Sequence, residues 1–204
     1  MITLKVEQLS KNFGDRKVLK DLNFEVAAPG AIGITGLNGS GKTTLMKILA
    51  QMLTPTKGKV TLAIEEKAVP AEHFLDHIKM VGPEMALYEM LTGYENLRFF
   101  GKLAGVKMDR TEQDALLAKV GLTGRGDDMV GAYSSGMKQR LKYAVALLGR
   151  PTVLILDEPT ANLDEEGKAI VGTIMAEHKR EGILVVATNE AEDLTRVERV
   201  IRLG

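Results

Sequence analysis

A short glycine-rich stretch has the residue types and spacing of a phosphate-binding loop. Residues 36–44 read Gly-Leu-Asn-Gly-Ser-Gly-Lys-Thr-Thr, which fits the pattern of Gly, four residues, then Gly-Lys-Ser/Thr. The glycines allow a tight turn whose backbone N–H groups approach phosphate oxygens closely. The lysine can reach the β- and γ-phosphates of a nucleotide, and the following threonine hydroxyl can ligate Mg²⁺. The predicted nucleotide-binding residues are Gly36, Leu37, Asn38, Gly39, Ser40, Gly41, Lys42, Thr43 and Thr44.

Two consecutive carboxylates, Asp157 and Glu158, form a second group of residues that could take part in catalysis or metal binding. They follow four apolar residues, Val153-Leu154-Ile155-Leu156, which are typical of a central parallel strand. The carboxyl end of such a strand is where open α/β sheets bind ligands, and a phosphate loop lies at the same edge. We therefore predict that Asp157 binds Mg²⁺ directly or through water and that Glu158 orients and deprotonates an attacking water. A solvated acidic turn is the alternative, and the pairing with the phosphate loop disfavours it.

The elements around these residues predict an α/β fold, a P-loop NTPase core with a mostly parallel sheet. Apolar residues 31–35 precede the loop as a buried strand, and residues 45–49 follow it as a helix. Alternating polar and apolar residues predict antiparallel strands over residues 2–7 and 18–26, and another strand over residues 59–64.

The sequence of the second half of the chain predicts a helical insertion followed by the remaining elements of this core. Short helical segments separated by Gly and Pro indicate a helical subdomain inserted at about residues 71–135. The core then continues with a helix over residues 165–180 and strands over residues 183–187 and 200–203. We expect one domain over residues 1–204, with residues 1–70 and 136–204 forming the core.

The composition excludes several classes of protein. The 204 residues include 27 basic and 27 acidic side chains, so the net charge is zero and gives nucleic-acid binding no support. Because there is no cysteine, disulfides, thiolate metal ligands and cysteine nucleophiles are excluded. The N-terminus does not read as a signal peptide, and no apolar run approaches the ~20 residues of a membrane span. We expect any work at a membrane to go through a partner, with no direct membrane insertion.

From Phe13 to Asn189 the chain resembles the nucleotide-binding subunit of ATP-binding cassette (ABC) transporters. Residues 133–140, Tyr-Ser-Ser-Gly-Met-Lys-Gln-Arg, resemble the family signature Leu-Ser-Gly-Gly-Gln. Asp157-Glu158-Pro159-Thr160 and Asn162-Leu163-Asp164 follow it, as in the family. The resemblance implies the ABC ATPase fold, with an antiparallel N-terminal β subdomain and an inserted helical subdomain. It also implies an ATP hydrolase that uses ATP and Mg²⁺.

The resemblance further implies a homodimer that forms on ATP binding. In the family, ATP lies between the phosphate loop of one protomer and the signature of the other. The implied signature residues are Ser134, Ser135, Gly136 and Met137. Ser134 and the Gly136 backbone would donate hydrogen bonds to the γ-phosphate, and because they open a predicted helix running to about residue 148, N-capping by Ser134 is compatible with this role.

Two further residues receive family roles with structural alternatives. Phe13 lies where the family places an aromatic that stacks on adenine, and a buried turn anchor is its alternative. Asp164 matches the D-loop aspartate that crosses the dimer interface, and an N-cap for the helix that follows is equally compatible.

Three departures from the family pattern bear on catalysis. Ser135 replaces a glycine and Met137 replaces a glutamine in the signature. The Q-loop glutamine is missing, and Glu84, beside the equivalent position, could approach Mg²⁺ as a charged ligand. The switch histidine is replaced by Asn189, which can hydrogen-bond the γ-phosphate but cannot hold a proton near neutral pH. We expect Glu158 to support hydrolysis, at a rate lowered by Asn189.

The resemblance implies a cytoplasmic subunit, peripheral at the cytoplasmic face of the inner membrane, that powers a transmembrane permease. The permease would enter a groove between core and helical subdomain near Leu87, Tyr88 and residues 92–97. The chain resembles small exporter ATPases, among which the heme exporter of cytochrome c maturation is the leading candidate, with drug, lipid or polysaccharide export as alternatives. A non-transport ABC ATPase and an ATP-binding regulatory subunit without turnover also remain open.

Overall fold

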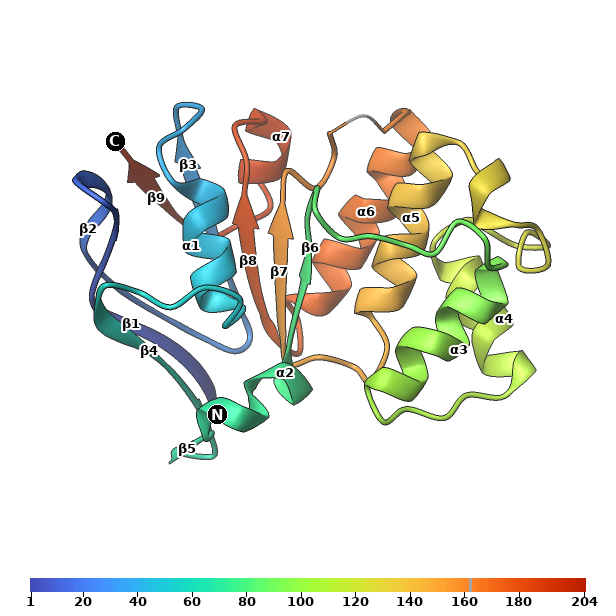
Figure 1. Ribbon diagram of the computed structural model, residues 1–204, viewed down its shortest axis with the longest axis horizontal. Helices are drawn as coiled ribbons and strands as arrows, with labels where there is room; N and C mark the ends of the chain where they lie inside the picture. The colour runs from blue at the N-terminus through green and yellow to red at the C-terminus, as the bar shows by residue number, and fades with distance from the viewer. Residues whose placement is uncertain (162) are drawn as a thin grey trace.

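The computed structural model describes residues 1–161 and 163–204, so Asn162 of the D-loop motif lies outside the described residues. An antiparallel sheet and a parallel sheet lie side by side, and most helices lie on the far side of the parallel sheet (Figure 1). The predicted α/β fold is confirmed.

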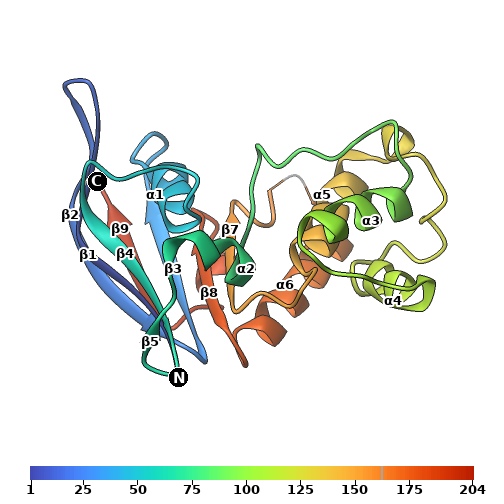
Figure 2. The same cartoon turned by 60° about the horizontal axis from the view of Figure 1, so that its bottom comes forward.

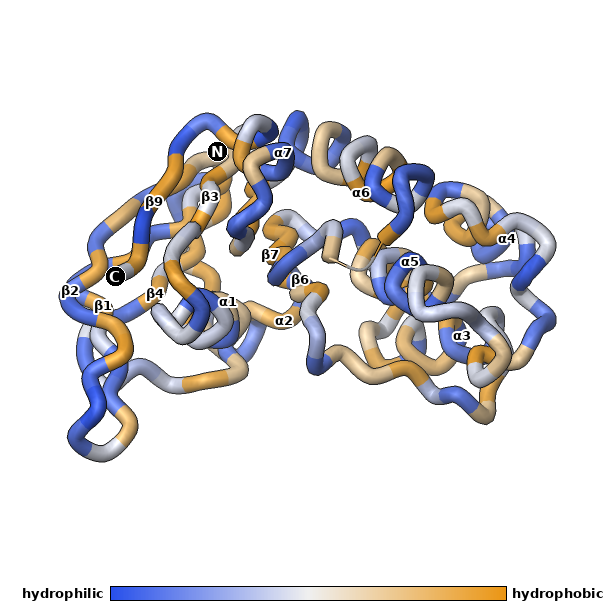
Figure 3. Tube along the Cα trace, turned by 90° about the horizontal axis from the view of Figure 1, so that it is seen from above, coloured by the Kyte–Doolittle hydropathy of each residue, from blue (hydrophilic) through white to orange (hydrophobic). Residues whose placement is uncertain are grey.

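The antiparallel sheet has the strand order β2-β1-β4-β5. Its bounds are Ile2–Phe13 for β1, Arg16–Ala27 for β2, Lys57–Ile64 for β4 and Lys67–Ala68 for β5. Hydrophobic and hydrophilic residues alternate along the β1–β2 hairpin (Figure 3), because one face of the sheet is buried. Leu4, Val6 and Leu9 are buried on that face. The hairpin is longer than predicted, since β1 continues to Phe13 before the turn.

The parallel sheet has the order β6-β7-β8-β3-β9, and all of its strands run parallel. Its bounds are Gly30–Gly36 for β3, Ile78–Val81 for β6, Val153–Asp157 for β7, Ile183–Ala187 for β8 and Arg199–Leu203 for β9. Alternate residues of β7 enter two cores. Val153 and Ile155 pack with α1 (Lys42–Leu49) and the antiparallel sheet. Leu154 and Leu156 pack with the helices on the opposite face, which explains why the β7 sequence is continuously apolar.

The helices on that opposite face form a second layer and a lobe beyond it (Figures 1 and 2). The layer contains α5 (Ser135–Ala146) and α6 (Glu165–His178). The lobe contains α3 (Gly93–Leu103), α4 (Arg110–Lys119) and the 3₁₀ turn η2 (Val130–Ala132). Capping boxes of Thr92 with Glu95 and of Asp109 with Glu112 fix the starts of α3 and α4.

One strand corrects the predicted subdomain boundary. After the short η1 (Ala71–His73) and α2 (Phe74–His77), β6 pairs with β7, so residues 78–81 belong to the parallel sheet. The helical insertion therefore begins after β6 and not near residue 71. The four residues of β6 have no clear period, which is why the sequence did not indicate a strand. Among the described residues, no helix combines the length and apolar character that a membrane crossing requires.

Candidate functional site

The phosphate loop lies at the carboxyl end of the parallel sheet, between β3 and α1 (Figure 1). Two of its glycines are needed for steric reasons. A Cβ at Gly36 would lie 2.5 Å from the Leu203 carbonyl oxygen, and one at Gly41 would lie 2.8 Å from Val18 Cγ1. Gly41 also has φ +102°, a backbone conformation that L-residues rarely adopt. The loop is therefore a tight backbone turn that leads into the N-terminus of α1. This is the geometry of an anion-binding site.

Lys42 begins α1 and folds back over the loop. Its side chain is buried, with a residue exposure of 7%. Its Nζ donates a hydrogen bond to the Gly36 carbonyl at 2.8 Å and lies 3.7 Å from Glu158 Oε1. Because a buried ammonium requires partners, this amine is suited to receive the negative charge of a phosphate.

Thr43 and Asp157 form a pair of oxygen ligands suited to Mg²⁺. Thr43 Oγ1 donates to Asp157 Oδ2 at 2.7 Å, while the buried Asp157 Oδ1 has no hydrogen-bond partner. Burial raises the pKa of Asp157, and the hydrogen bond from Thr43 partly opposes this. A hard cation with oxygen ligands would satisfy the unpartnered oxygen and favour the charged form of the carboxylate, so these two residues fit the metal that ATP requires.

Glu158 stands one residue past β7 with its backbone in the left-handed region, at φ +51°. Its N–H donates to the carbonyl of Ala187 at the end of β8, 2.8 Å away, which holds this strained conformation. Burial raises the pKa of Glu158, and Lys42 partly counters the effect. A carboxylate with a raised pKa beside a phosphate site suits a general base.

Two residues that replace family residues have protein partners in this structure. Asn189 Oδ1 accepts from the Gly36 N–H at 3.3 Å and from Thr35 Oγ1 at 3.2 Å. Asn189 thus contacts the first residue of the phosphate loop. Glu84 Oε1 pairs with Lys47 Nζ at 2.6 Å, an interaction with α1 that competes with the predicted Mg²⁺ contact, which stays a prediction.

A cavity of about 500 Å³ lies over the phosphate loop, and Phe13 is part of its wall. Gly39, Gly41, Lys42, Thr43, Thr44 and Glu158 also line it. Phe13 is 50% exposed, so the alternative of a buried turn anchor is wrong. Stacking on adenine stays a prediction, and the exposed ring beside the loop is compatible with it. Lys11 Nζ lies 5.0 Å from the ring centroid, so a cationic group is close to this aromatic ring.

The signature and D-loop residues cap helices outside this cavity. Ser134 Oγ accepts from the Met137 N–H at 3.2 Å at the start of α5, close to Ser135 and Gly136. Asp164 Oδ1 accepts from the Gly167 N–H at 2.8 Å at the start of α6. Both capping interpretations are confirmed. Among the described residues, none of the signature positions lines the cavity over the loop of its own chain.

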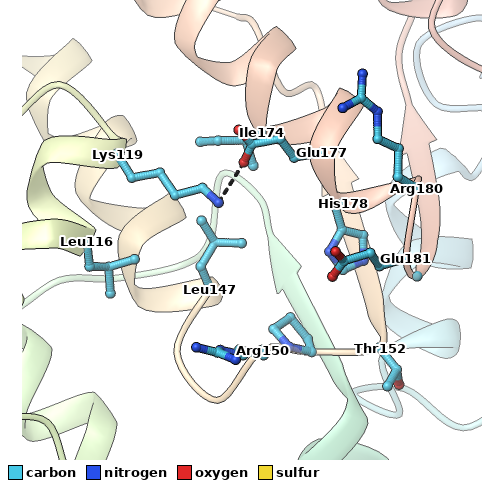
Figure 4. Close-up of a pocket in the computed structure, with 12 residues that line it drawn as sticks. Leu116, Lys119, Leu147, Arg150, Thr152, Ile174, Glu177, His178, Arg180 and Glu181 are labelled. Carbon is cyan, nitrogen blue, oxygen red and sulfur yellow. Dashed lines mark ion pairs between the residues drawn. The ribbon is translucent and has the colours of Figure 1, made fainter. Parts of the chain in front are cut away.

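A second cavity, of about 640 Å³, lies at the amino end of the same sheet (Figure 4). It is lined by residues of α4, the end of α5 and the end of α6. Lys119 and Glu177 form an ion pair of 2.7 Å across it, and a ring nitrogen of His178 lies 3.2 Å from the Ile183 carbonyl oxygen. None of the residues predicted for ATP binding or catalysis lies in this cavity.

Several residues near the loop escaped sequence reasoning. Arg16 and Val18 line the cavity with Phe13, because the β1–β2 hairpin brings them there. Thr35 and Lys47 are the partners of Asn189 and Glu84. Arg16 follows Phe13 by only three residues, so its place in the same cavity could have been predicted from the predicted role of Phe13. The other contacts depend on the folded loops.

Comparison with known proteins agrees with this geometry. A family model described as ABC transporter matches residues 19–161. The daunorubicin resistance ATP-binding protein of Streptomyces coeruleorubidus is 38% identical over 168 residues, which cover 81% of this chain and 53% of that protein. The chain spans about half the length of curated relatives such as this one.

Two solved structures share the fold. An ATP-binding subunit of an ABC transporter superposes with a TM-score of 0.85 at 28% identity, covering 98% of this chain and 85% of that one. A dimeric ATP-binding cassette in a post-hydrolysis state, bound to ADP and Pi, gives a TM-score of 0.84 at 22% identity, covering 98% and 94%.

Proposed function

The chain belongs to the ABC transporter family, and we propose that it is the ATP-binding and ATP-hydrolysing subunit of an ABC exporter. The observation that carries the proposal is the arrangement of two adjacent carboxylates at the phosphate loop. Asp157 is bound by Thr43 and keeps one buried oxygen without a partner, and Glu158 lies 3.7 Å from the amine of Lys42. One carboxylate is suited to a cation and the other to a water.

Hydrolysis follows from these positions. The loop N–H groups and Lys42 bind the ATP phosphates, and Thr43 and Asp157 would hold Mg²⁺, which neutralises phosphate charge. Glu158 takes a proton from a water whose oxygen bonds to the γ-phosphorus. The bond from that phosphorus to the bridging oxygen breaks and leaves ADP and phosphate. The raised pKa of Glu158 favours proton acceptance in this step.

We place the active form as a dimer in which each signature faces the partner's ATP. Ser134 and Gly136 lie at the N-terminus of α5, where helix dipole and N–H groups attract an anion. They do not line the cavity of their own chain within the described residues, so a nucleotide contact would have to come from a second protomer. The similar dimeric cassette with ADP and Pi supports this arrangement by analogy of fold.

A permease would dock in the apolar groove between α1, β6 and α3. The groove has a volume of about 320 Å³, and its lining includes Met52, Leu75, Met85, Phe100 and Leu103. Tyr88, half exposed, stacks edge-on against Phe99 near this groove, with 4.6 Å between ring centroids. In the predicted contact range 92–97, Asn96 and Leu97 are fully buried and cannot contribute. Docking here would hold the subunit at the cytoplasmic face of the inner membrane.

For the cargo, the relative from Streptomyces is a drug-resistance protein, which favours export of small molecules. Heme export stays a prediction that this relative does not support. The cargo itself would be selected by the permease.

Asn189 supports a second candidate, an ATP-binding regulatory subunit without turnover. Its amide oxygen is bonded to the phosphate loop at Gly36, and it lacks the proton-holding ring of a histidine. Such a chain would bind ATP, dimerise and later release the ATP without hydrolysing it. A turnover assay separates the two functions.

The experiment measures Mg²⁺-dependent ATP turnover by the purified chain, together with ATP affinity. We expect Glu158→Gln to lower turnover by about 10²-fold or more with ATP binding retained, since a general base contributes that much. Asn189→His is expected to raise turnover. Glu177→Gln, the same substitution in the amino-end cavity, serves as the matched control and should change neither quantity.

The outcomes separate the candidates. ATP binding without turnover in the wild type and in all three variants would favour the regulatory subunit. Turnover that Glu158→Gln leaves at the wild-type rate would overturn the role of Glu158 as the base.

A further inference from the structure

Glu158 is positioned by the loop that carries it more than by contacts of its own side chain. Its carboxylate is one-third exposed and approaches Lys42 only to 3.7 Å. Its backbone is left-handed, a strained conformation that persists only where neighbouring structure enforces it. The residues that hold the loop Glu158–Thr160 therefore determine where this base points.

Tyr143 of α5 holds this loop from the side of the helical layer. Its side chain is fully buried, and its hydroxyl donates to the carbonyl oxygen of Pro159 at 2.8 Å. Burial raises the pKa of Tyr143, so the phenol stays protonated as a donor. Tyr143 lies on the helix that Ser134 caps, nine positions further along the chain. The helix that presents the signature is thus bonded to the residue next to Glu158.

Asp193 of α7 (Ala191–Leu194) holds the same loop from the opposite side. It is 1% exposed, and its Oδ2 accepts from Thr160 Oγ1 at 2.8 Å and from Thr188 Oγ1 at 3.3 Å. Thr160 ends the loop that carries Glu158, and Thr188 directly precedes Asn189. One buried carboxylate oxygen therefore joins the loop after β7 to the loop after β8.

Burial alone does not account for these polar groups. A hydrophobic side chain would fill the space of Tyr143 without the cost of burying a hydroxyl. Asp193 is costlier still, because its Oδ1 is buried without a partner and burial raises its pKa. Fixed hydrogen bonds of this kind specify geometry where apolar contacts do not.

We propose that Tyr143 and Asp193 are positioning residues for Glu158, bonding its loop to the signature helix on one side and to the Asn189 loop on the other. This inference rests on the proposed function, because it assigns the two residues a role in ATP hydrolysis. It predicts that removing either bond lowers the rate of hydrolysis while ATP binding at the phosphate loop is unaffected.

The test uses two substitutions that remove only a hydroxyl donor, Tyr143→Phe and Thr160→Val, in the full chain. Each is expected to lower kcat by roughly tenfold, since small misplacement of a catalytic group is costly. The dissociation constant for ATP should stay within about twofold of wild type. Thr152→Val is the matched control. It removes a hydroxyl that donates to the His77 carbonyl at 3.3 Å, at the opposite end of β7, and should leave kcat unchanged.

A double-mutant cycle separates positioning from general stability. In the Glu158→Gln background, Tyr143→Phe should cause no further loss of turnover, because its effect passes through Glu158. A tenfold loss in that background, an equal loss in Thr152→Val, or unchanged kcat in both Tyr143→Phe and Thr160→Val would each overturn the inference. Absence of turnover in the wild type would instead contradict the proposed function itself, and the inference with it.

Discussion

The two ends of the parallel sheet differ in how completely their polar groups are satisfied. Each end has a cavity, of about 500 Å³ over the phosphate loop and about 640 Å³ at the amino end. Among the described residues, four buried side-chain polar atoms lack a hydrogen-bond partner, and three of them, on Ser40, Asp157 and Asp193, lie at the carboxyl end, in the phosphate loop, at the end of β7 and in α7. At the amino end, Lys119 pairs with Glu177, and His178 contacts the Ile183 carbonyl.

In this comparison, cavity size does not distinguish the proposed ATP site, whereas buried polar groups without partners do. A buried oxygen without a partner destabilises the folded chain and persists where a ligand supplies the missing interaction. The amino-end cavity is the larger of the two, but its residues in Figure 4 include the ion pair of Lys119 with Glu177, and among the described residues none that line it has a buried side-chain polar atom without a partner. Predictions at matched positions in the two regions test this contrast.

The largest effect is expected for Asp157→Asn. Mg²⁺-dependent turnover should fall by about 10²-fold or more, because metal binding to ATP supplies several kcal/mol. The nucleotide-free chain should become more stable by about 1 kcal/mol, as is common when a functional site is neutralised. The raised pKa of Asp157 gives the sign. Because the folded-state pKa of Asp157 is raised, protonation of this carboxyl stabilises the folded chain at pH values below its usual pKa. This contribution is lost as pH rises through the raised pKa, so at neutral pH the buried charge is destabilising.

Turnover assays and urea unfolding at pH 7 measure both parts of this prediction. Glu177→Gln at the amino end is the control, where loss of an exposed ion pair should change the free energy of unfolding by less than about 1 kcal/mol and leave turnover unchanged. If Asp157→Asn instead destabilised the nucleotide-free chain, the contrast between the two ends would be broken.

The next largest effect is expected for Gly41→Ala. Its Cβ would lie 2.8 Å from Val18 Cγ1 with φ at +102°, so the loop must shift and ATP affinity should fall by at least about tenfold. Gly149→Ala, near the amino end, has φ +71° and a contact of 3.2 Å to the Val106 side chain. It should cost about 1–2 kcal/mol of stability without affecting ATP affinity. Nucleotide titration and thermal unfolding of both variants decide the matter, and equal losses of affinity would contradict the steric argument.

Sequence patterns predicted which residues meet at the carboxyl end because these residues lie in short local motifs. The loop at residues 36–44 and the Asp157-Glu158 pair follow apolar strands, so the parallel sheet brings them together. The same reasoning could not find the bond from Asn189 to Gly36, which joins residues 153 positions apart through the geometry of two loops. The roles of Tyr143 and Asp193 were hidden for a related reason, since each sits in a helix where its burial depends on distant elements.

The errors have similar causes. For Phe13, the alternative of a buried turn anchor, weighed beside adenine stacking, fails because half of the side chain is exposed at the end of β1. β6 was missed because four residues at the edge of a sheet carry little periodicity, and only pairing with β7 identifies them.

A smaller effect on stability is expected for Ser134→Gly, which separates helix capping from nucleotide recognition. Glycine is a tolerated N-cap, so the variant should lose only a few tenths of a kcal/mol of stability. Loss of the hydroxyl should nevertheless reduce turnover by roughly tenfold, the value of a hydrogen bond to a charged group. Asp109→Gly at the start of α4 is the control cap, with a similar change in stability and no change in turnover. Equal turnover in the two variants would confine Ser134 to capping.

The smallest effect is expected at the amino end, from His178→Gln. Burial lowers the pKa of His178, opposed by its bond to the Ile183 carbonyl and by Glu181, while Lys119 lowers it further. A lowered pKa means that stability is fully present above the usual value of 6.5 and is lost as pH falls through the folded-state value. Glutamine can donate to the same carbonyl without titrating. The free energies of unfolding of wild type and variant should therefore match at pH 8 and diverge on acidification, by no more than about 1 kcal/mol.

Urea unfolding from pH 8 to pH 5 measures this difference. ATP turnover at pH 8 should be equal in the two proteins, and a loss in His178→Gln would show that the amino-end cavity communicates with the phosphate loop, against the contrast drawn between the two ends.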